Sequence, residues 1–200
     1  MQIKIENARL NWAAGLFTPS AAVPGATEKY NCHLILMPDT VCRTLDGAAI
    51  SLDAAIEKIA REAFGANWKP MLEAISWDKK CVRPGSRNID KDGNVRPEYQ
   101  GNLFIAAKNS TAPAVFDNCN DPQTGKVMCV TEQSGRIYSG CRVNAKIEIY
   151  AMVPAAKRSV ACTVLGVQFF KDDTRLSGGG VASPDDFDAV VDTSAVDGLL

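Results

Sequence analysis

The segment 141–153 alternates between apolar and polar side chains, and this pattern restricts the possible folds more than any other in the chain. The apolar side chains of one phase are Cys141, Val143, Ala145, Ile147, Ile149, Ala151 and Val153. The opposite phase holds Arg142, Asn144, Lys146, Glu148 and Tyr150. A period of two residues is that of a β-strand, whose successive side chains point to opposite faces of a sheet. We therefore expect a long strand in a sheet with one buried face and one polar face.

Further strands are predicted on both sides of this segment. Residues 2–12 alternate with a change of phase near Asn7, which suggests a strand with a bulge. Other strands are expected at 30–37, 103–108, 127–131 and 160–171. The last of these is apolar in both phases, so we expect it to be covered on both faces.

The clearest helix is predicted over 51–64, where apolar residues recur on one face. Ser51 can cap its start and Gly65 can end it. Turn-rich segments, at 117–125 and 135–140 among others, separate the predicted strands. Several strands with frequent turns and one or two helices predict a mainly β domain, most simply a small barrel.

Composition narrows the class of protein. The 200 residues suit one domain with an appendage, and a hydrophobic content of 46% can form a sizeable core. No run of about 18 apolar residues predicts a membrane span, and the polar N-terminus lacks the pattern of an export signal, which favours the cytoplasm. The seven cysteines include no CxxC pair and His33 is the single histidine. We therefore expect buried, reduced thiols and a structural histidine, with no metal site.

The stretch 79–108 is the most basic part of the chain. Its seven Lys and Arg residues face only three acidic residues, which leaves a net charge of +4. Turn signals such as Pro84-Gly85 make most of it loop, and aromatic residues lie in and beside it. Cations attract phosphates and flat apolar rings accept unstacked bases, so the stretch suits a single nucleic-acid strand. The alternative is a solvated surface loop.

Charge also separates the end of the chain from the rest. All 22 Lys and Arg residues lie at or before Arg175, whereas five of the 23 acidic residues follow it. Three glycines at 178–180 lead into a segment with no base, which predicts a body over 1–176 and a flexible acidic tail over 177–200. The tail residues expected to bind partner proteins are Asp185, Asp186, Phe187, Asp188, Asp192 and Asp197.

No pattern indicates catalysis. The phosphate-cradling and nucleophile motifs are absent, and Ser139 has no candidate base other than His33. The segment 88–93 resembles a calcium loop, but its twelfth position holds Tyr99 where a bidentate acid belongs. Two readings besides an enzyme remain open: a protein that coats single strands, and a structural or assembly protein of a virion that has no nucleic-acid activity.

Several segments, in this order, resemble a known family. They are IKIENARL, KYNCHLILMP with AAIEKIAREAF, Tyr-Gln-Gly at 99–101, IYSGCRV, and LGVQFFKDD before the glycines and the acidic tail. The set resembles phage-encoded single-stranded DNA-binding proteins of the OB fold, over nearly the whole chain. The resemblance implies a five-stranded OB-fold-like barrel, a positively charged cleft, no base-sequence specificity, no catalysis and no cofactor. Related tails end in an aromatic residue, whereas this chain ends at Leu200 with Phe187 internal.

We therefore expect single-stranded DNA as the ligand, in replication or recombination in the cytoplasm of the bacterial host. Further expected partners are replication or recombination proteins bound by the tail, and neighbouring copies along the DNA. Trp12 and Phe169 fall in apolar phases and are expected in the core. The candidate DNA-binding residues are Trp77, Lys79, Lys80, Arg83, Arg87, Arg96, Tyr99, Lys108, Tyr138, Arg142, Lys146 and Tyr150.

Overall fold

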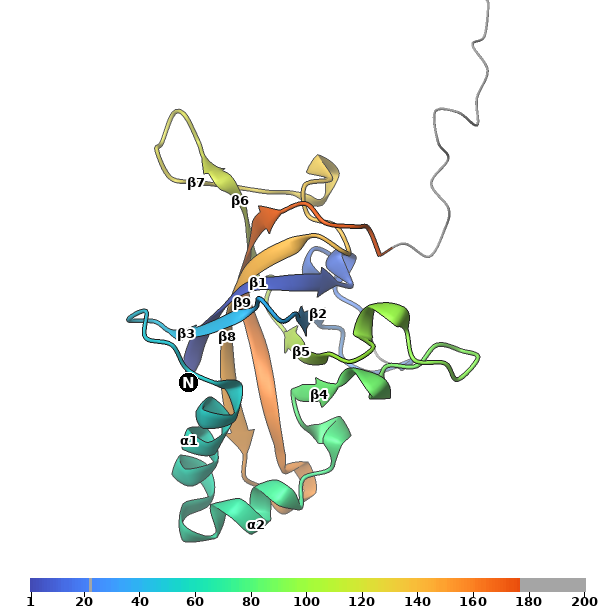
Figure 1. Cartoon of the computed structure of the whole chain (residues 1–200), viewed down its shortest axis with the longest axis vertical. Coiled ribbons are helices and arrows are strands. Elements are labelled where there is room, and N and C mark those ends of the chain that lie inside the picture. The colour runs from blue at the N-terminus through green and yellow to red at the C-terminus, as the bar shows by residue number, and fades with distance from the viewer. Residues whose placement is uncertain (22, 177–200) are drawn as a thin grey trace, which may run out of the picture.

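The computed structural model describes residues 1–21 and 23–176, so the acidic tail expected over 177–200 lies outside the described residues. Nine strands and two α-helices form in the described part (Figure 1). The strands are β1 (Gln2–Asn11), β2 (Tyr30–Leu36), β3 (Val41–Thr44), β4 (Val82–Pro84), β5 (Leu103–Asn109), β6 (Ala114–Asn120), β7 (Val127–Cys129), β8 (Arg142–Met152) and β9 (Ser159–Lys171). The helices are α1 (Leu52–Phe64) and α2 (Trp68–Glu73).

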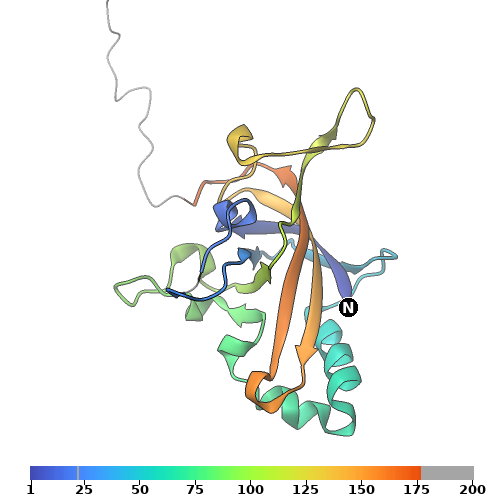
Figure 2. The same ribbon diagram turned by 180° about the vertical axis from the view of Figure 1, so that it is seen from behind.

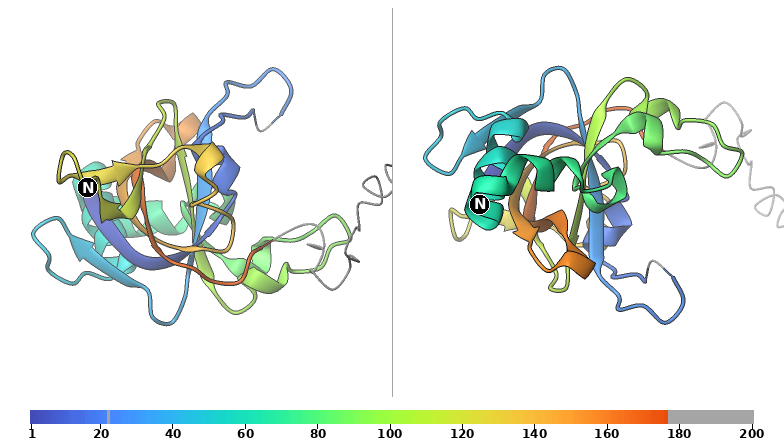
Figure 3. Two further views of the ribbon diagram at one scale, coloured as in Figure 1. Left: turned by 90° about the horizontal axis from the view of Figure 1, so that it is seen from above. Right: turned by 90° about the horizontal axis from the view of Figure 1, so that it is seen from below.

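All nine strands belong to one sheet, in the order β4-β5-β2-β1-β8-β9-β6-β7, with β3 paired to β1. Viewed from above and from below, its strands curve around a common interior (Figure 3). β5 and β6 follow one another in the chain but lie far apart in this order, because β6 pairs in parallel with β9. The chain just before β4 also contacts the start of β9, since the backbone N–H of Cys81 donates to the carbonyl oxygen of Val160 at 2.8 Å.

The mainly β fold with two helices is confirmed, and the strand pattern differs from a simple five-stranded barrel. The ladder of the described strands does not close, since its terminal strands β4 and β7 are not paired with each other. β3, β4 and β6 are strands that the alternation pattern did not predict; β6 occupies part of the segment expected to be turn-rich.

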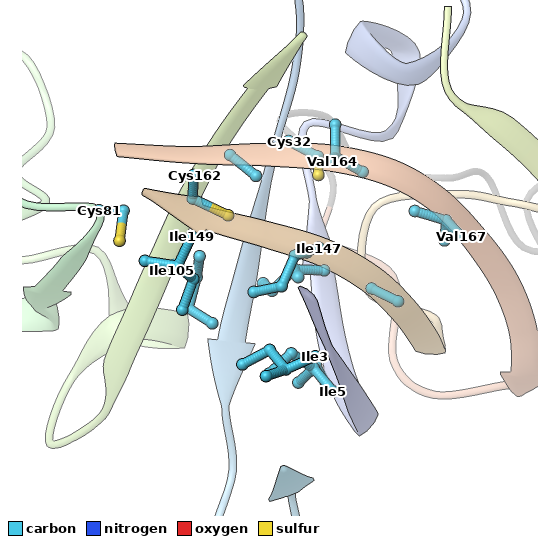
Figure 4. Packing of buried hydrophobic residues seen from close by; sticks show 14 of the residues in the cluster. Ile3, Ile5, Cys32, Cys81, Ile105, Ile147, Ile149, Cys162, Val164 and Val167 are labelled. Carbon is cyan, nitrogen blue, oxygen red and sulfur yellow. The ribbon is translucent and has the colours of Figure 1, made fainter. Parts of the chain in front are cut away.

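The core lies between the inward faces of the curved sheet. β1 changes phase at Asn7, whose φ is 60°, and its register against β8 shifts between Ile5 and Ala8. This bulge keeps Ile3, Ile5, Ala8 and Leu10 fully buried, as the sequence predicts. They pack against the inward side chains of the other strands, among them Cys32, Ile105, Ile147, Ile149, Cys162 and Val164 (Figure 4).

The predicted helix is confirmed with its cap. The Ser51 hydroxyl accepts a hydrogen bond from the backbone N–H of Ala54 at 3.1 Å, and Gly65 ends the helix with a φ of 60°. Ile59 and Phe64 are among the side chains that α1 buries. α1 and α2 lie beside the end of β8 and the start of β9, where these two strands are connected (Figure 2). Neither α-helix of the described residues is long and apolar enough to cross a membrane.

Two expectations about burial are wrong. β9 is fully buried on one face only, because its alternate residues such as Ala161 and Thr163 line a surface groove. Four cysteines are buried, but Cys119 and Cys129 are exposed. Both belong to the β6–β7 hairpin, which projects from the body and is not covered by a second layer of the described residues (Figure 1).

Candidate nucleic-acid interface

Two adjoining hollows run over the outer side of the β2–β5 pair and the start of β9. The first has a volume of about 330 Å³ and the second about 250 Å³. Both are lined by Lys29 and Lys108, so we treat them as one groove and call it the cleft. The first hollow also holds Lys79, Lys80, Arg83 and Tyr150, and the second holds Asn31 and His33.

Strand register places these side chains on the outside of the sheet. Lys108 of β5 lies opposite Asn31 of β2, and Ala106 lies opposite His33. The intervening residues, such as Cys32 and Ala107, are buried in the core. Lys29 is positioned just before β2 by two backbone hydrogen bonds with Ser20, each 3.0 Å long.

The cleft is strongly positive. Five of its lining residues carry a positive charge and only Asp78 carries a negative one. None of those five cations forms a salt bridge with a carboxylate within residues 1–21 and 23–176. The guanidinium of Arg83 instead donates to the backbone carbonyl oxygens of Lys80 (2.8 Å) and Asp78 (2.7 Å). Burial lowers the pKa of Arg83, but an arginine starts so high that it stays charged at neutral pH.

Exposed aromatic rings stand along the cleft. The side chain of Tyr150 is 41% exposed, as is that of Trp77, which adjoins the lining residue Asp78. The guanidinium of Arg87 lies 5.3 Å from the centre of the Trp77 ring. The exposed part of this indole is a candidate surface for stacking an unpaired base.

Trp12 is also exposed, at 45%, and the expectation that it packs in the core is wrong. Its indole meets the His33 ring edge-on, with centres 6.4 Å apart. The guanidinium of Arg96 lies 5.7 Å from the indole. The alternation of β1 ends at Asn11, so the phase that suggested burial does not extend to Trp12. Phe169 is in the core, as expected.

Tyr99, expected as an exposed stacking ring, is wholly buried. It packs with Ile35 and Phe104 in a second hydrophobic cluster on the outer side of β2 and β5. Asn11 Nδ2 donates to its phenol oxygen at 3.0 Å, and the phenol lies 2.8 Å from His33 Nδ1. The ring therefore anchors the 85–102 loop to the sheet. The alternation of β5 cannot reveal this, because Tyr99 lies outside the strand.

His33 is held neutral at the edge of the cleft. Burial, followed by the charges of Arg83 and Lys108, lowers the pKa of His33 to about 4. Because the amide of Asn11 can only donate to Tyr99, the phenol proton is left to donate to His33 Nδ1. His33 therefore belongs to the scaffold, as the sequence predicts.

Three sequence candidates lie away from the cleft. Arg142 is bound by two carboxylates, at 2.6 Å from Asp173 and 3.2 Å from Asp39, so it is not the free cation that was expected. Tyr138 donates its hydroxyl to Asp172 at 2.8 Å. Lys146 lines a separate groove of about 550 Å³ on the outer face of β8.

The end of the described chain is fixed near the cleft. The backbone N–H of Leu176 donates to the carbonyl oxygen of Ser139 at 2.8 Å, and Arg9 donates to the carbonyl oxygen of Thr174 at 2.8 Å. Leu176 packs on the cluster of Ile35, Tyr99 and Phe104, which His33 also contacts.

The lining of the cleft includes five of the candidate DNA-binding residues, Lys79, Lys80, Arg83, Lys108 and Tyr150, and it adds Lys29 and Asn31. Trp12 lies beside the lining residue His33. The signal for Asn31 was available, since it shares the outward phase of the predicted strand with His33. Lys29 carried no such signal. Within the described residues, no group of three or more His, Cys, Asp and Glu side chains is placed to hold a metal ion.

Comparison with known proteins matches residues 1–199 to the family described as Enterobacter phage Enc34, ssDNA-binding protein. Protein p50 of Acyrthosiphon pisum secondary endosymbiont phage 1 is 33% identical over 189 residues, 94% of this chain and 93% of that protein. The single-stranded DNA-binding protein from bacteriophage Enc34 in complex with ssDNA has a similar fold. It has a TM-score of 0.58 and 23% identity over 88% of this chain and 89% of that one. Another structure of the Enc34 protein gives 0.57 and 22% over 94% and 90%. This chain belongs to the family of the Enterobacter phage Enc34 ssDNA-binding protein.

Proposed function

We propose that this protein binds single-stranded DNA without reading its base sequence, and that it coats and protects exposed strands in phage DNA replication and recombination. The observation that carries the proposal is the cleft, where five cations and one carboxylate residue lie beside exposed aromatic rings. Membership of the Enc34 family supports the same ligand.

The chemistry of the cleft suits a flexible strand. Four of the five cations are lysines, which act as mobile point charges and attract phosphates whatever the base. Binding releases the counterions that phosphates hold in solution, and rings such as Trp77 and Tyr150 accept any unpaired base on their faces. In a duplex the bases are stacked inside and cannot use the rings. The proposed role is therefore that of a binding protein, not an enzyme.

The acidic tail has a role in the same proposal. Its five carboxylates have the charge of phosphates, and Leu176, which precedes the tail, packs beside the cleft. We infer that the tail competes with DNA for cations such as Lys79, Lys80 and Arg83. DNA that displaces it leaves its carboxylates available to replication or recombination proteins in the cytoplasm of the bacterial host. Neighbouring copies along the strand are further proposed partners.

A titration with fluorescently labelled oligo(dT) tests the function directly. We expect tight binding that weakens with salt, by about 0.7 log unit per tenfold salt for each phosphate contact, and much weaker binding to a duplex of equal length. Oligo(dA) or oligo(dC) should bind within a small factor of oligo(dT). A virion structural protein would show no binding to any of these strands, and equal affinity for duplex and single strand would contradict the proposal.

A further inference from the structure

Trp12 has a backbone conformation that large residues rarely adopt. Its φ and ψ are 60° and 44°, in the left-handed region where glycine is the usual occupant. In the part of the chain that the structure describes, the other residue with a positive φ apart from glycines is Asn7. An asparagine tolerates this region, whereas an indole does not gain from it. The indole is nevertheless 45% exposed, so a large part of the ring is open to a ligand.

A buried polar network holds this conformation. The backbone N–H of Trp12 donates to Asn11 Oδ1 at 2.7 Å, and Asn11 is only 6% exposed. The other end of the Asn11 amide donates to Tyr99, which in turn reaches His33. The next backbone N–H, of Ala13, donates to the hydroxyl of Ser139 at 3.1 Å. Side chains from four separate parts of the chain thus fix a strained turn.

The indole that this turn presents borders the cleft. It lies against the edge of the His33 ring, and His33 lines the second hollow together with Lys29, Asn31 and Lys108. The Arg96 guanidinium, 5.7 Å from the indole, forms no salt bridge within the described residues. A flat apolar ring, an unpaired cation and a positive groove therefore meet at one place.

We propose that Trp12 is a stacking platform for one unpaired base of the bound strand, and that Arg96 binds a phosphate of the same or the adjoining nucleotide. This subsite rests on the proposed function. Its ligand is any nucleobase, since every base offers a flat π face, and a phosphate flanks each one. The strain at Trp12 is retained because the turn aims the indole at the strand.

Replacing Trp12 by glycine removes the ring without leaving a strained backbone, so the contribution of the ring to DNA binding can be measured. Glycine adopts the left-handed region freely, so Trp12→Gly relieves the backbone strain, which opposes the loss of the contacts of the ring, and the full-length protein should stay folded. Affinity for oligo(dT) should nevertheless fall by about 5-fold to 100-fold, with the salt slope unchanged, because one stacked base is lost and no cation is removed. The protein should also discriminate less between oligo(dT) and an abasic strand of equal length. Trp12→Phe should restore part of the affinity.

Trp68 provides the matched control. It pairs with the Arg61 guanidinium at 4.3 Å, but its helix, α2, lines neither hollow of the cleft. Trp68→Phe should leave the affinity unchanged. In a Trp68→Phe/Trp77→Phe double variant, Trp12 is the remaining tryptophan of the three, and its emission should change on binding oligo(dT) but not an abasic strand.

Three outcomes would overturn the subsite. They are wild-type affinity in Trp12→Gly, an equal loss of affinity for oligo(dT) and for the abasic strand in that variant, and no change in Trp12 emission while oligo(dT) binds. If the wild-type protein bound no single strand at all, the proposed function itself would fail, and the subsite with it.

Discussion

Each cation of the cleft is available to a phosphate because it forms no salt bridge with a carboxylate of the described residues. Lys108 lines both hollows without a carboxylate partner in the described part of the chain, whereas Arg142 is held by Asp39 and Asp173. Two residues of the same charge thus differ in their use: one is free to bind a phosphate and the other stabilises the fold. At the scale of single residues, position decides function more than residue type does.

Removing the Lys108 charge should reduce the salt dependence of binding. In Lys108→Gln, the slope of log affinity against log salt should fall by about 0.7, because one phosphate contact is lost. Lys146→Gln removes the same charge from the outer face of β8, away from the cleft, and should leave the slope unchanged. Titrations of oligo(dT) at several salt concentrations measure both. Equal effects of the two variants would argue against the cleft as the binding path.

His33 should make the fold sensitive to mild acid. Its pKa is near 6.5 in an unfolded chain and about 4 in the fold, so between these values the unfolded chain binds more protons. Stability is therefore full above pH 6.5 and falls as the pH drops towards 4, by about 2 kcal/mol between pH 7.5 and 5. Urea denaturation at the two pH values measures the loss. His33→Gln should flatten the dependence, and an unchanged dependence in that variant would assign it to other groups.

The buried hydroxyl of Tyr99 should stabilise the fold without contributing to stacking. Tyr99→Phe removes the shorter hydrogen bond of Asn11 Nδ2 and of His33 Nδ1 and leaves them only longer contacts, 3.4 Å to Glu98 and 3.5 Å to Asn88. This should lower the free energy of unfolding by about 1–3 kcal/mol. The salt slope of DNA binding should stay the same. Urea denaturation and an oligo(dT) titration check the two parts. A variant as stable as the wild type would show that the polar network contributes little.

At the scale of elements, the 85–102 loop carries residues to the cleft because it packs tightly on the sheet. Gly85 donates to the carbonyl oxygen of Asn102 at 2.7 Å, and a Cβ atom at Gly85 would clash with the carbonyl oxygen of Tyr99. Arg87 and Arg96, which lie over the two exposed tryptophans, both belong to this loop. The position of the loop thus determines where these cations stand.

Gly85→Ala should therefore move the loop. We expect a loss of about 1–3 kcal/mol in the free energy of unfolding and weaker binding of oligo(dT), because the clash displaces both arginines. Gly93→Ala is the control: it lies in the same loop with a φ of +85° and open space around it. That variant should lose only about 1 kcal/mol and keep its affinity. Normal affinity in Gly85→Ala would mean that the loop does not position the binding residues.

At the scale of the whole molecule, charge is divided between a basic body and an acidic tail. The residues that lead into the tail are held to the body. Leu176 packs on the second hydrophobic cluster, Arg9 donates to the carbonyl oxygen of Thr174, and Arg142 donates to the carboxylate of Asp173. Truncation after Gly180 removes all five tail carboxylates. We expect the truncated protein to bind oligo(dT) more tightly, most at low salt, because screening by salt weakens the competition. Parallel titrations of the two proteins at low and high salt measure the difference.

A full-length variant with the five tail aspartates changed to asparagine separates charge from length. It should match the truncated protein in affinity if carboxylates compete with phosphates. Unchanged or weaker binding by both variants at low salt would refute the competition, whatever role the tail has with partner proteins.

The sequence by itself determined the features that depend on neighbouring residues. The long strand at 141–153, the bulge at Asn7 and the capped helix after Ser51 follow from local periodicity and local hydrogen bonding. The basic stretch is equally local, and it supplies Lys79, Lys80, Arg83 and Lys108 to the cleft.

The tertiary structure alone decided which of the candidate side chains are exposed and which are paired. Tyr99 is buried because β2, β5 and the end of β1 surround it, and Trp12 is exposed because a strained turn directs it outwards. Lys29 joins Lys108 only because β2 pairs with β5, some 80 residues away in the chain. Burial and ion pairing depend on partners distant in sequence, and no local pattern records where those partners lie.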